Sequence, residues 1–155
     1  SRFPFAEAIE TVARANALEA KRHGHELTCG PLEDLPLIVG DRSRLEQVMT
    51  NILGNAIKYT PDGGHIRISA GSTDSEVWME VCDDGIGIPE KDQDRIFDRF
   101  YRVDKARSRE SGGTGLGLSI AKEIVQRHHG NIALAPHQGP GTTVRLTLPI
   151  GGPAA

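Results

Sequence analysis

Hydrophobic positions recur with helical spacing in two long segments of the first sixty residues. One segment predicts a helix from about Pro4 to Arg22, with Gly24 suited to its C-cap. The second predicts a longer helix that Asp41 caps and that runs to about Tyr59, where a Pro-Asp-Gly-Gly turn at 61–64 ends it. The apolar stripes are Phe5, Ile9, Val12 and Ala13 in the first helix, and Leu45, Val48, Met49, Ile52, Leu53 and Ala56 in the second.

Alternation of apolar and polar residues predicts strands between and after these helices. The clearest alternation places Ile66 and Ile68 on one face of one strand, and Val77, Met79 and Val81 on one face of the next. A polar break at 71–75 separates those two strands. The predicted strands are Glu26–Cys29, Leu37–Val39, His65–Ala70, Glu76–Cys82, Asn131–Ala135 and Thr142–Leu148.

The remaining segments predict two further helices and a long polar loop. A short helix is expected from Glu90 to about Phe97, and Asp104–Gly113 has the polar, basic, Gly-ended composition of a mobile loop. A helix from about Leu116 to His129 is expected to end at Gly130. Its apolar positions are Ile120, Ala121, Ile124 and Val125. This mixture predicts an α+β fold, a two-layer sandwich in which helices cover one face of a mixed sheet.

Length and composition limit the class of protein. The 155 residues fit one domain, expected at 1–150, with a disordered tail at 151–155. A net charge of −3 argues against a nucleic-acid footprint and against a basic membrane-binding surface. Two widely separated cysteines, Cys29 and Cys82, form no disulfide framework and are expected to be buried small side chains. The six histidines lack the spacing of a zinc site.

The second helix carries polar residues beside its buried stripe. Asn51 and Asn55 are four residues apart and lie roughly 40° from each other around the helix axis, with Lys58 and Tyr59 on the same flank. An amide oxygen is a neutral ligand suited to Mg²⁺, and a lysine ammonium can meet a phosphate. The alternative is that both asparagines only hydrogen-bond to neighbouring backbone groups.

A strand runs directly into Asp83, and Gly85 and Gly87 follow it within the segment Val81–Pro89. Glycines let the backbone turn tightly and approach a ligand closely. A carboxylate at such a turn can accept a hydrogen bond from the exocyclic amine of a purine. The alternative is an ordinary Asp-Gly turn.

Two further segments are individually weak signals. The glycine-rich stretch Gly112–Ser119 opens a helix, whose N-terminal N–H groups are suited to phosphate, but it is neither a Walker A loop nor a Rossmann fingerprint. The segment Arg95–Arg109 combines aromatic residues with Arg99, Arg102, Lys105 and Arg107. It can be an anchored anion-binding loop or an amphipathic helix followed by a solvated basic stretch.

The order of these four segments resembles one family closely. NxxxNAxKY, DxGxGIP, FxRFYR and GTGLGL occur in the order of the N, G1, F and G2 boxes of sensor histidine kinases, within the superfamily that also contains gyrase, Hsp90 and MutL ATPases. The resemblance extends from about Phe5 to Pro149. It implies a two-layer sandwich with ATP held between the helix layer and a flexible ATP lid at about 98–112.

The resemblance also implies a role for each motif residue. Asn55 would be the Mg²⁺ ligand, with Asn51 near it, and Lys58 would approach the phosphates of ATP. Asp83 would bind the adenine amino group. The remaining residues implied to contact the nucleotide are Tyr59, Gly85, Gly87, Ile88, Arg102, Lys105, Gly113, Thr114, Gly115, Leu116, Gly117 and Leu118.

One departure from the wider superfamily bears on the chemistry. Its ATPases carry a water-activating Glu one turn before the metal-binding Asn, and here that position is Asn51. Efficient ATP hydrolysis is therefore not expected, and we expect transfer of the γ-phosphoryl group to a histidine by positioning and charge neutralisation. No histidine here lies in a phosphoacceptor motif, so the acceptor is expected on a dimerisation domain of the same parent protein, with a response regulator downstream.

Further expectations follow from the resemblance. The isolated domain is expected to be a monomer and the parent a homodimer. Many relatives are membrane receptors and some are soluble, so we expect a cytoplasmic domain on a parent that is either soluble or anchored in the inner membrane. The alternatives are a serine kinase of the anti-sigma type, which the FDRFYR and GTGLGL segments disfavour, and a non-catalytic module that binds only nucleotide or a partner.

Overall fold

A computed structural model describes residues 1–85, 117–135 and 141–151. Five strands form one sheet in the order β2-β4-β5-β7-β6, and β1 pairs with β3 in a small separate sheet. The elements are β1 Arg2–Pro4, α1 Phe5–Arg22, β2 Glu26–Cys29, β3 Leu37–Val39, α2 Arg42–Tyr59, β4 His65–Ser72, β5 Glu76–Asp83, α5 Gly117–Arg127, β6 Asn131–Leu134 and β7 Thr142–Pro149.

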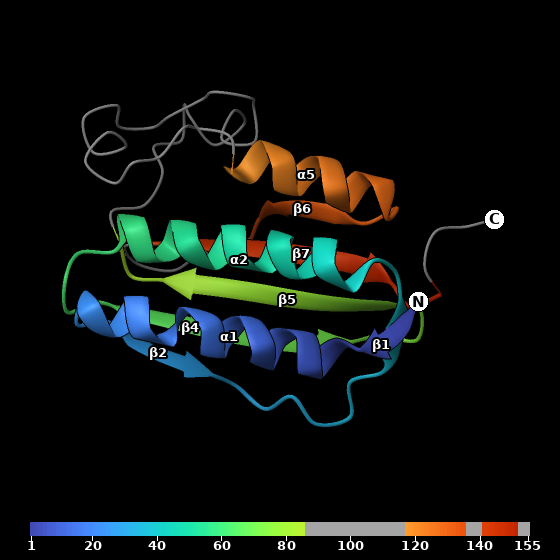
Figure 1. Ribbon diagram of the computed structural model, residues 1–155, viewed down its shortest axis with the longest axis horizontal. Helices are drawn as coiled ribbons and strands as arrows, with labels where there is room; N and C mark the ends of the chain where they lie inside the picture. Colours follow the sequence, from blue (N-terminus) through green and yellow to red (C-terminus); the bar gives the residue numbers. More distant parts are fainter. Residues whose placement is uncertain (86–116, 136–140, 152–155) are drawn as a thin grey trace.

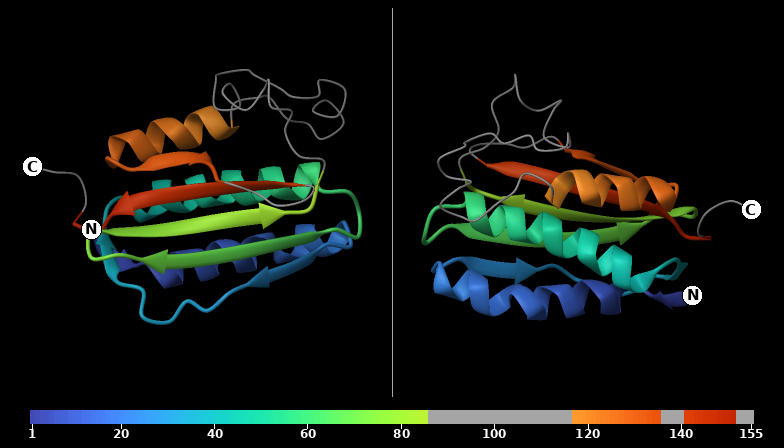
Figure 2. Two further views of the ribbon diagram at one scale, coloured as in Figure 1. Left: turned by 180° about the vertical axis from the view of Figure 1, so that it is seen from behind. Right: turned by 45° about the horizontal axis from the view of Figure 1, so that its top comes forward.

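The helices and the large sheet form two layers. Helices α1, α2 and α5 lie side by side on one face of the sheet (Figure 1). Seen from behind, the opposite face carries no helix within the described ranges (Figure 2). Strand β2 runs parallel to β4, whereas the β4–β5, β5–β7 and β6–β7 pairs are antiparallel, so the sheet is mixed. The predicted α+β sandwich is confirmed.

The core lies between the two layers and follows the predicted periodicities. Along β5 buried and half-buried residues alternate, because successive side chains point to opposite faces of a strand. Every residue of the stripe predicted for α2 is buried. The stripe predicted for α5 departs at Ile120, which is 37% exposed, while Ala121, Ile124 and Val125 are buried.

The ends of the helices are fixed by specific caps. Asp41 accepts a hydrogen bond from the backbone N–H of Arg44 at 3.2 Å, as expected for the N-cap of α2. Helix α5 ends in a Schellman motif: His129 has φ 59°, its N–H donates to Gln126, and the N–H of Gly130 donates to Val125. The prediction that Gly130 caps this helix is therefore wrong by one residue.

The reason is that Gly130 has a packing role instead. A Cβ on Gly130 would collide with the carbonyl oxygen of Thr147 in β7. Glycine is needed at this position for close approach of the backbone to the sheet, and His129 takes the left-handed conformation.

Two other predictions need correction. Strand β4 continues through Gly71 and Ser72, which were expected to form a break, because the indole of Trp78 in β5 packs against Gly71 and extends the pairing. Cys29, expected to be buried, is exposed, and Cys82 is half-buried. The N-terminal strand β1 was not predicted, since it depends on antiparallel pairing with β3, which is distant in the sequence.

Candidate functional site

The ends of three elements meet at one edge of the molecule. Helices α2 and α5 run antiparallel, so the start of α2 lies beside the end of α5. There the backbone N–H of Asp41 donates to Nε2 of His128 at 3.1 Å. The start of α5 at Gly117 therefore lies toward the C-terminal half of α2. Strand β5 ends at the same edge (Figure 1).

Asp83 is a buried carboxylate at the end of β5. It is 9% exposed and shares the helix-facing side of the strand with Val81 and Met79. One carboxylate oxygen, Oδ1, accepts the N–H of Gly85 at 2.9 Å, which fixes the turn that leaves the strand. A carboxylate here faces the space between the layers, so it can serve as an acceptor for a ligand bound between them.

Gly85 is required by the closeness of α2 to this turn. A Cβ on Gly85 would lie 2.5 Å from the carbonyl oxygen of Tyr59 and 3.1 Å from Cα of Thr60. The turn after β5 and the C-terminus of α2 are therefore in direct contact, which brings two motifs from distant parts of the sequence together.

Asp83 also lies against Thr142, the first residue of β7, and against Gly141 in the loop before it. Thr142 is its cross-strand partner on the same face, and a Cβ on Gly141 would collide with the backbone carbonyl oxygen of Asp83. Gly141 has φ 117°, a conformation that favours glycine. Sequence reasoning missed both residues. The signal available was a Gly-Thr pair at a strand start, which is too common to indicate a site.

The polar flank of α2 is half-buried. Asn51, Asn55, Lys58 and Tyr59 all have intermediate exposure, whereas Ile52 and Ala56 beside them are buried. They lie at the edge of the helix–sheet contact, as the helical spacing predicted. The amide oxygens of Asn51 and Asn55 and the ammonium group of Lys58 can contact a ligand that binds beside α2.

Several predicted site residues lie outside the described residues, as do the predicted helix Glu90–Phe97 and the predicted lid at 98–112. Of the glycine-rich segment, the structure describes Gly117 and Leu118, which begin α5. The predicted nucleotide-contacting residues outside the described ranges are Gly87, Ile88, Arg102, Lys105, Gly113, Thr114, Gly115 and Leu116.

A charged pair joins the end of β5 to the start of β4. Asp84 Oδ1 accepts the backbone N–H of His65 at 2.7 Å, and Oδ2 accepts from Nδ1 of the same residue at 2.8 Å. The backbone hydrogen bond from His65 holds the pKa of Asp84 below its usual value. The side-chain hydrogen bond to Asp84 raises the pKa of His65.

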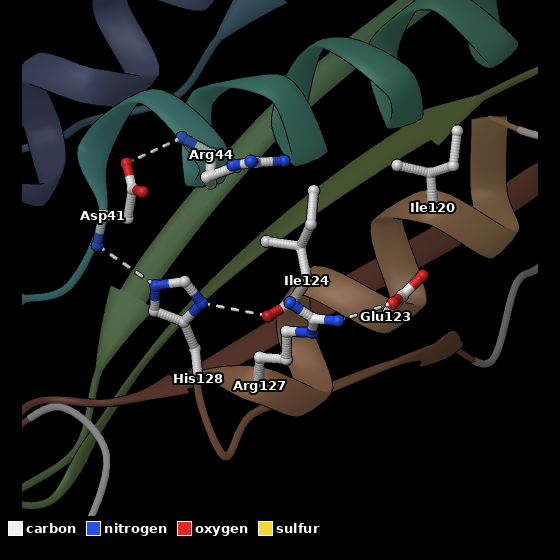
Figure 3. Close-up of a pocket in the computed structure, with 7 residues that line it drawn as sticks. All are labelled: Asp41, Arg44, Ile120, Glu123, Ile124, Arg127 and His128. Atoms are coloured by element: carbon white, nitrogen blue, oxygen red, sulfur yellow. Dashed lines mark hydrogen bonds and ion pairs between the residues drawn. The ribbon is translucent and has the colours of Figure 1, made fainter.

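A pocket of about 450 Å³ lies at the other end of α2 (Figure 3). Its lining includes Arg44 from α2 and Ile120, Glu123 and Ile124 from α5. Its lining residue Arg44 lies about 22 Å along the helix axis from Tyr59, which contacts the turn after Asp83, and no residue that lines the pocket belongs to the group around Asp83. The pocket is therefore distinct from the group of residues around Asp83.

No helix within the described parts of the chain has both the length and the apolar character required to cross a bilayer.

A family model described as "Histidine kinase-, DNA gyrase B-, and HSP90-like ATPase" matches residues 40–152. The sensor histidine kinase WalK of Bacillus subtilis is 53% identical to this chain over 111 residues, which are 70% of this chain and 18% of WalK. The chain thus corresponds to less than a fifth of that relative.

Solved structures agree with the sequence comparisons. The nucleotide-free catalytic domain of the histidine kinase ThkA superposes with a TM-score of 0.86 at 26% identity, covering 97% of this chain and 95% of that one. Full-length ShkA in complex with AMPPNP superposes with a TM-score of 0.82 at 28% identity, covering 100% of this chain and 32% of ShkA.

Proposed function

The chain belongs to the family of histidine kinase-, DNA gyrase B- and HSP90-like ATPases, and on that premise we propose that it is the ATP-binding catalytic domain of a two-component sensor histidine kinase. The observation that carries the proposal is the buried carboxylate of Asp83 between the layers, with the turn at Gly85 packed against the end of α2. The AMPPNP complex of ShkA supports a nucleotide as ligand.

The adenine would lie against the end of β5. Oδ1 of Asp83 is already held by the N–H of Gly85, so the orientation of the carboxylate is fixed before a ligand arrives. The carboxylate would accept a hydrogen bond from the adenine amino group. Thr142, on the same face, would contribute a hydroxyl next to it.

The phosphates would lie along α2 toward the start of α5. Lys58 would meet a phosphate as a point charge, and the first N–H groups of α5, from Gly117 and Leu118, would hold another. Tyr59 would contact the nucleotide. We propose that the motif residues outside the described ranges also contact the nucleotide.

The donors on α2 fit Mg²⁺ that arrives together with ATP. Asn55, with Asn51 one turn before it, offers a neutral amide oxygen as a metal ligand. The described residues contain no group of three or more His, Cys, Asp or Glu that could hold a metal ion. Mg²⁺ is commonly bound through substrate phosphates and few protein ligands. The metal would neutralise charge on the phosphates, and Asn55 would orient it.

The protein would act by positioning ATP and neutralising its charge. Asn51 stands where an ATPase of the superfamily has its general base, and an amide cannot activate water. The γ-phosphoryl group would therefore be retained until an imidazole of the dimerisation domain attacks it in line.

The proposal includes partners outside the chain. These are the dimerisation and phosphoacceptor domain of the same parent protein and a response regulator downstream. The isolated domain would be a cytoplasmic monomer, and the parent a homodimer that is soluble or anchored in the inner membrane. The alternatives of an anti-sigma serine kinase and a non-catalytic module gain no support from relatives that are named sensor histidine kinases.

A phosphotransfer assay tests this function. The chain is mixed with γ-labelled ATP, Mg²⁺ and the separately expressed dimerisation domain of the parent. We expect label on that domain that is stable to alkali and lost in acid, as phosphohistidine is, and none when the acceptor histidine is replaced by alanine. Acid-stable label on a serine, or no transfer by a chain that binds ATP, would contradict the proposal.

A further inference from the structure

Three charged side chains form a row across the sheet at the edge that carries Asp83. Glu26 starts β2, His65 starts β4, and Asp84 follows β5. Nε2 of His65 lies 3.3 Å from Oε2 of Glu26, and Nδ1 lies 2.8 Å from Oδ2 of Asp84. The row lies on the side of the sheet that no described helix covers, because Asp83 points toward the helices and its neighbour Asp84 points the opposite way.

Asp84 binds the start of β4 through both carboxylate oxygens. Oδ1 accepts the backbone N–H of His65 at 2.7 Å, while Oδ2 accepts from its imidazole, and the N–H of Asp84 donates back to the carbonyl of His65 at 3.2 Å. Gly64 makes room for this contact, since a Cβ there would lie 2.8 Å from Oδ1 of Asp84. Three hydrogen bonds therefore hold one residue of the turn.

Asp84 stands between the two residues that shape the proposed adenine pocket. Fixing its backbone fixes Asp83 before it and Gly85 after it, whose own hydrogen bond closes the turn. A displacement of about 1 Å in a positioning group is enough to reduce activity strongly.

We propose that His65 and Asp84 are positioning residues for nucleotide binding, which clamp the turn at 83–85 from the uncovered face of the sheet. The inference rests on the proposed function, because it concerns the same nucleotide pocket. Neither residue touches the ligand. Their contribution is transmitted through the backbone of Asp83 and Gly85.

The clamp is expected to depend on pH through His65. The charged groups that face it are Asp84 and, from β2, Glu26, with Arg67 two residues along its own strand. The side-chain hydrogen bond to Asp84 raises the pKa of His65 above its usual value, and the backbone hydrogen bond from His65 lowers the pKa of Asp84 below its usual value. The ion pair is thus complete between these values and is lost as the pH rises through the raised pKa of His65.

Binding of AMPPNP with Mg²⁺, measured by titration calorimetry, tests the clamp. For Asp84→Ala we expect affinity to fall by roughly tenfold at about pH 6. Asp84→Asn is expected to recover only part of the affinity, because its amide oxygen can still accept the backbone N–H of His65 but the variant forms no ion pair with the imidazole. Between about pH 6 and about pH 8.5, the affinity of the wild type should weaken more than that of His65→Gln. Titration of the nucleotide itself affects both proteins equally, so the difference between them reports on His65.

His23→Ala is the matched control. It removes another exposed histidine–aspartate pair, with Asp62, at 3.3 Å, and should leave affinity unchanged. Wild-type affinity in folded Asp84→Ala, or equal pH profiles for wild type and His65→Gln, would overturn the clamp while leaving the proposed function intact. If the folded wild type fails to bind AMPPNP, the proposed function itself fails.

Discussion

Asp83 and Asp84 are adjacent in sequence but have different partners, because strand alternation points them to opposite faces of the sheet. Asp83 is buried among the helices with one oxygen on the N–H of Gly85, and Asp84 is held by His65 on the other side. A single turn therefore carries both the proposed ligand contact and the contacts that hold it in place.

The closeness of α2 to this turn makes Gly85 sensitive to substitution. In Gly85→Ala the new methyl group would meet the carbonyl oxygen of Tyr59 at 2.5 Å, so the turn or the helix end must shift. We expect a loss of stability of about 1–3 kcal/mol and weaker nucleotide binding. Urea denaturation and calorimetric titration measure the two effects.

Gly54→Ala is the control for that substitution, since nothing lies within 4 Å of a Cβ at this position in α2. We expect it to raise stability by about 0.5–1 kcal/mol, because alanine loses less backbone entropy than glycine in a helix. Equal effects of the two substitutions would refute the close approach at Gly85.

Replacing Asn55 tests the proposed metal contribution separately from the proposed adenine contribution. Removing Mg²⁺ with a chelator should weaken AMPPNP binding to the wild type, and Asn55→Ala should bind with little further loss on chelation, because its amide ligand is already absent. Calorimetry with and without Mg²⁺ measures this difference. A full Mg²⁺ effect in Asn55→Ala would remove Asn55 from the metal site.

At the scale of elements, α2 is the part of the molecule that the sequence describes best. Its cap, apolar stripe and polar flank each have a local cause in side-chain type and spacing, so Asp41, the buried stripe and the half-buried Asn55 were all predictable. The same holds for β4 and β5, apart from the extension at Gly71, which depends on the Trp78 indole on the neighbouring strand.

The contacts that cross between elements were not predictable in this way. The pairing of Asp83 with Thr142, the closeness of Gly141 and the His65–Asp84 hydrogen bonds join residues far apart in sequence. They depend on strand order and register, which a period of two does not specify. The role of His129 at the end of α5 likewise depends on how closely Gly130 approaches β7.

Helix α2 should depend measurably on its N-cap. Asp41→Ala removes the acceptor for the N–H of Arg44 and is expected to cost about 1 kcal/mol, whereas Asp41→Ser, which retains a capping oxygen, should cost much less. Equilibrium denaturation of both variants measures the cap. Equal stabilities of the two would show that the hydrogen bond does not stabilise the helix.

At the scale of the whole molecule, the proposed domain retains the γ-phosphoryl group of ATP and does not transfer it to water. With Asn51 at the place of the general base, the isolated chain should hydrolyse ATP slowly and should transfer phosphate only when the phosphoacceptor domain is added. A steady-state assay of phosphate release measures this. Brisk turnover by the chain alone would contradict the proposed chemistry.

Titration calorimetry of the wild type and Asp83→Asn with AMPPNP and Mg²⁺ shows whether Asp83 binds the adenine of a nucleotide. The asparagine oxygen can keep the hydrogen bond from Gly85, so its amide NH₂ takes the place of the second carboxylate oxygen and meets the adenine amino group as a second donor. We expect saturable binding by the wild type and a loss of affinity of about 10- to 100-fold in the variant. No binding by the folded wild type, or equal affinity of the two proteins, would contradict it.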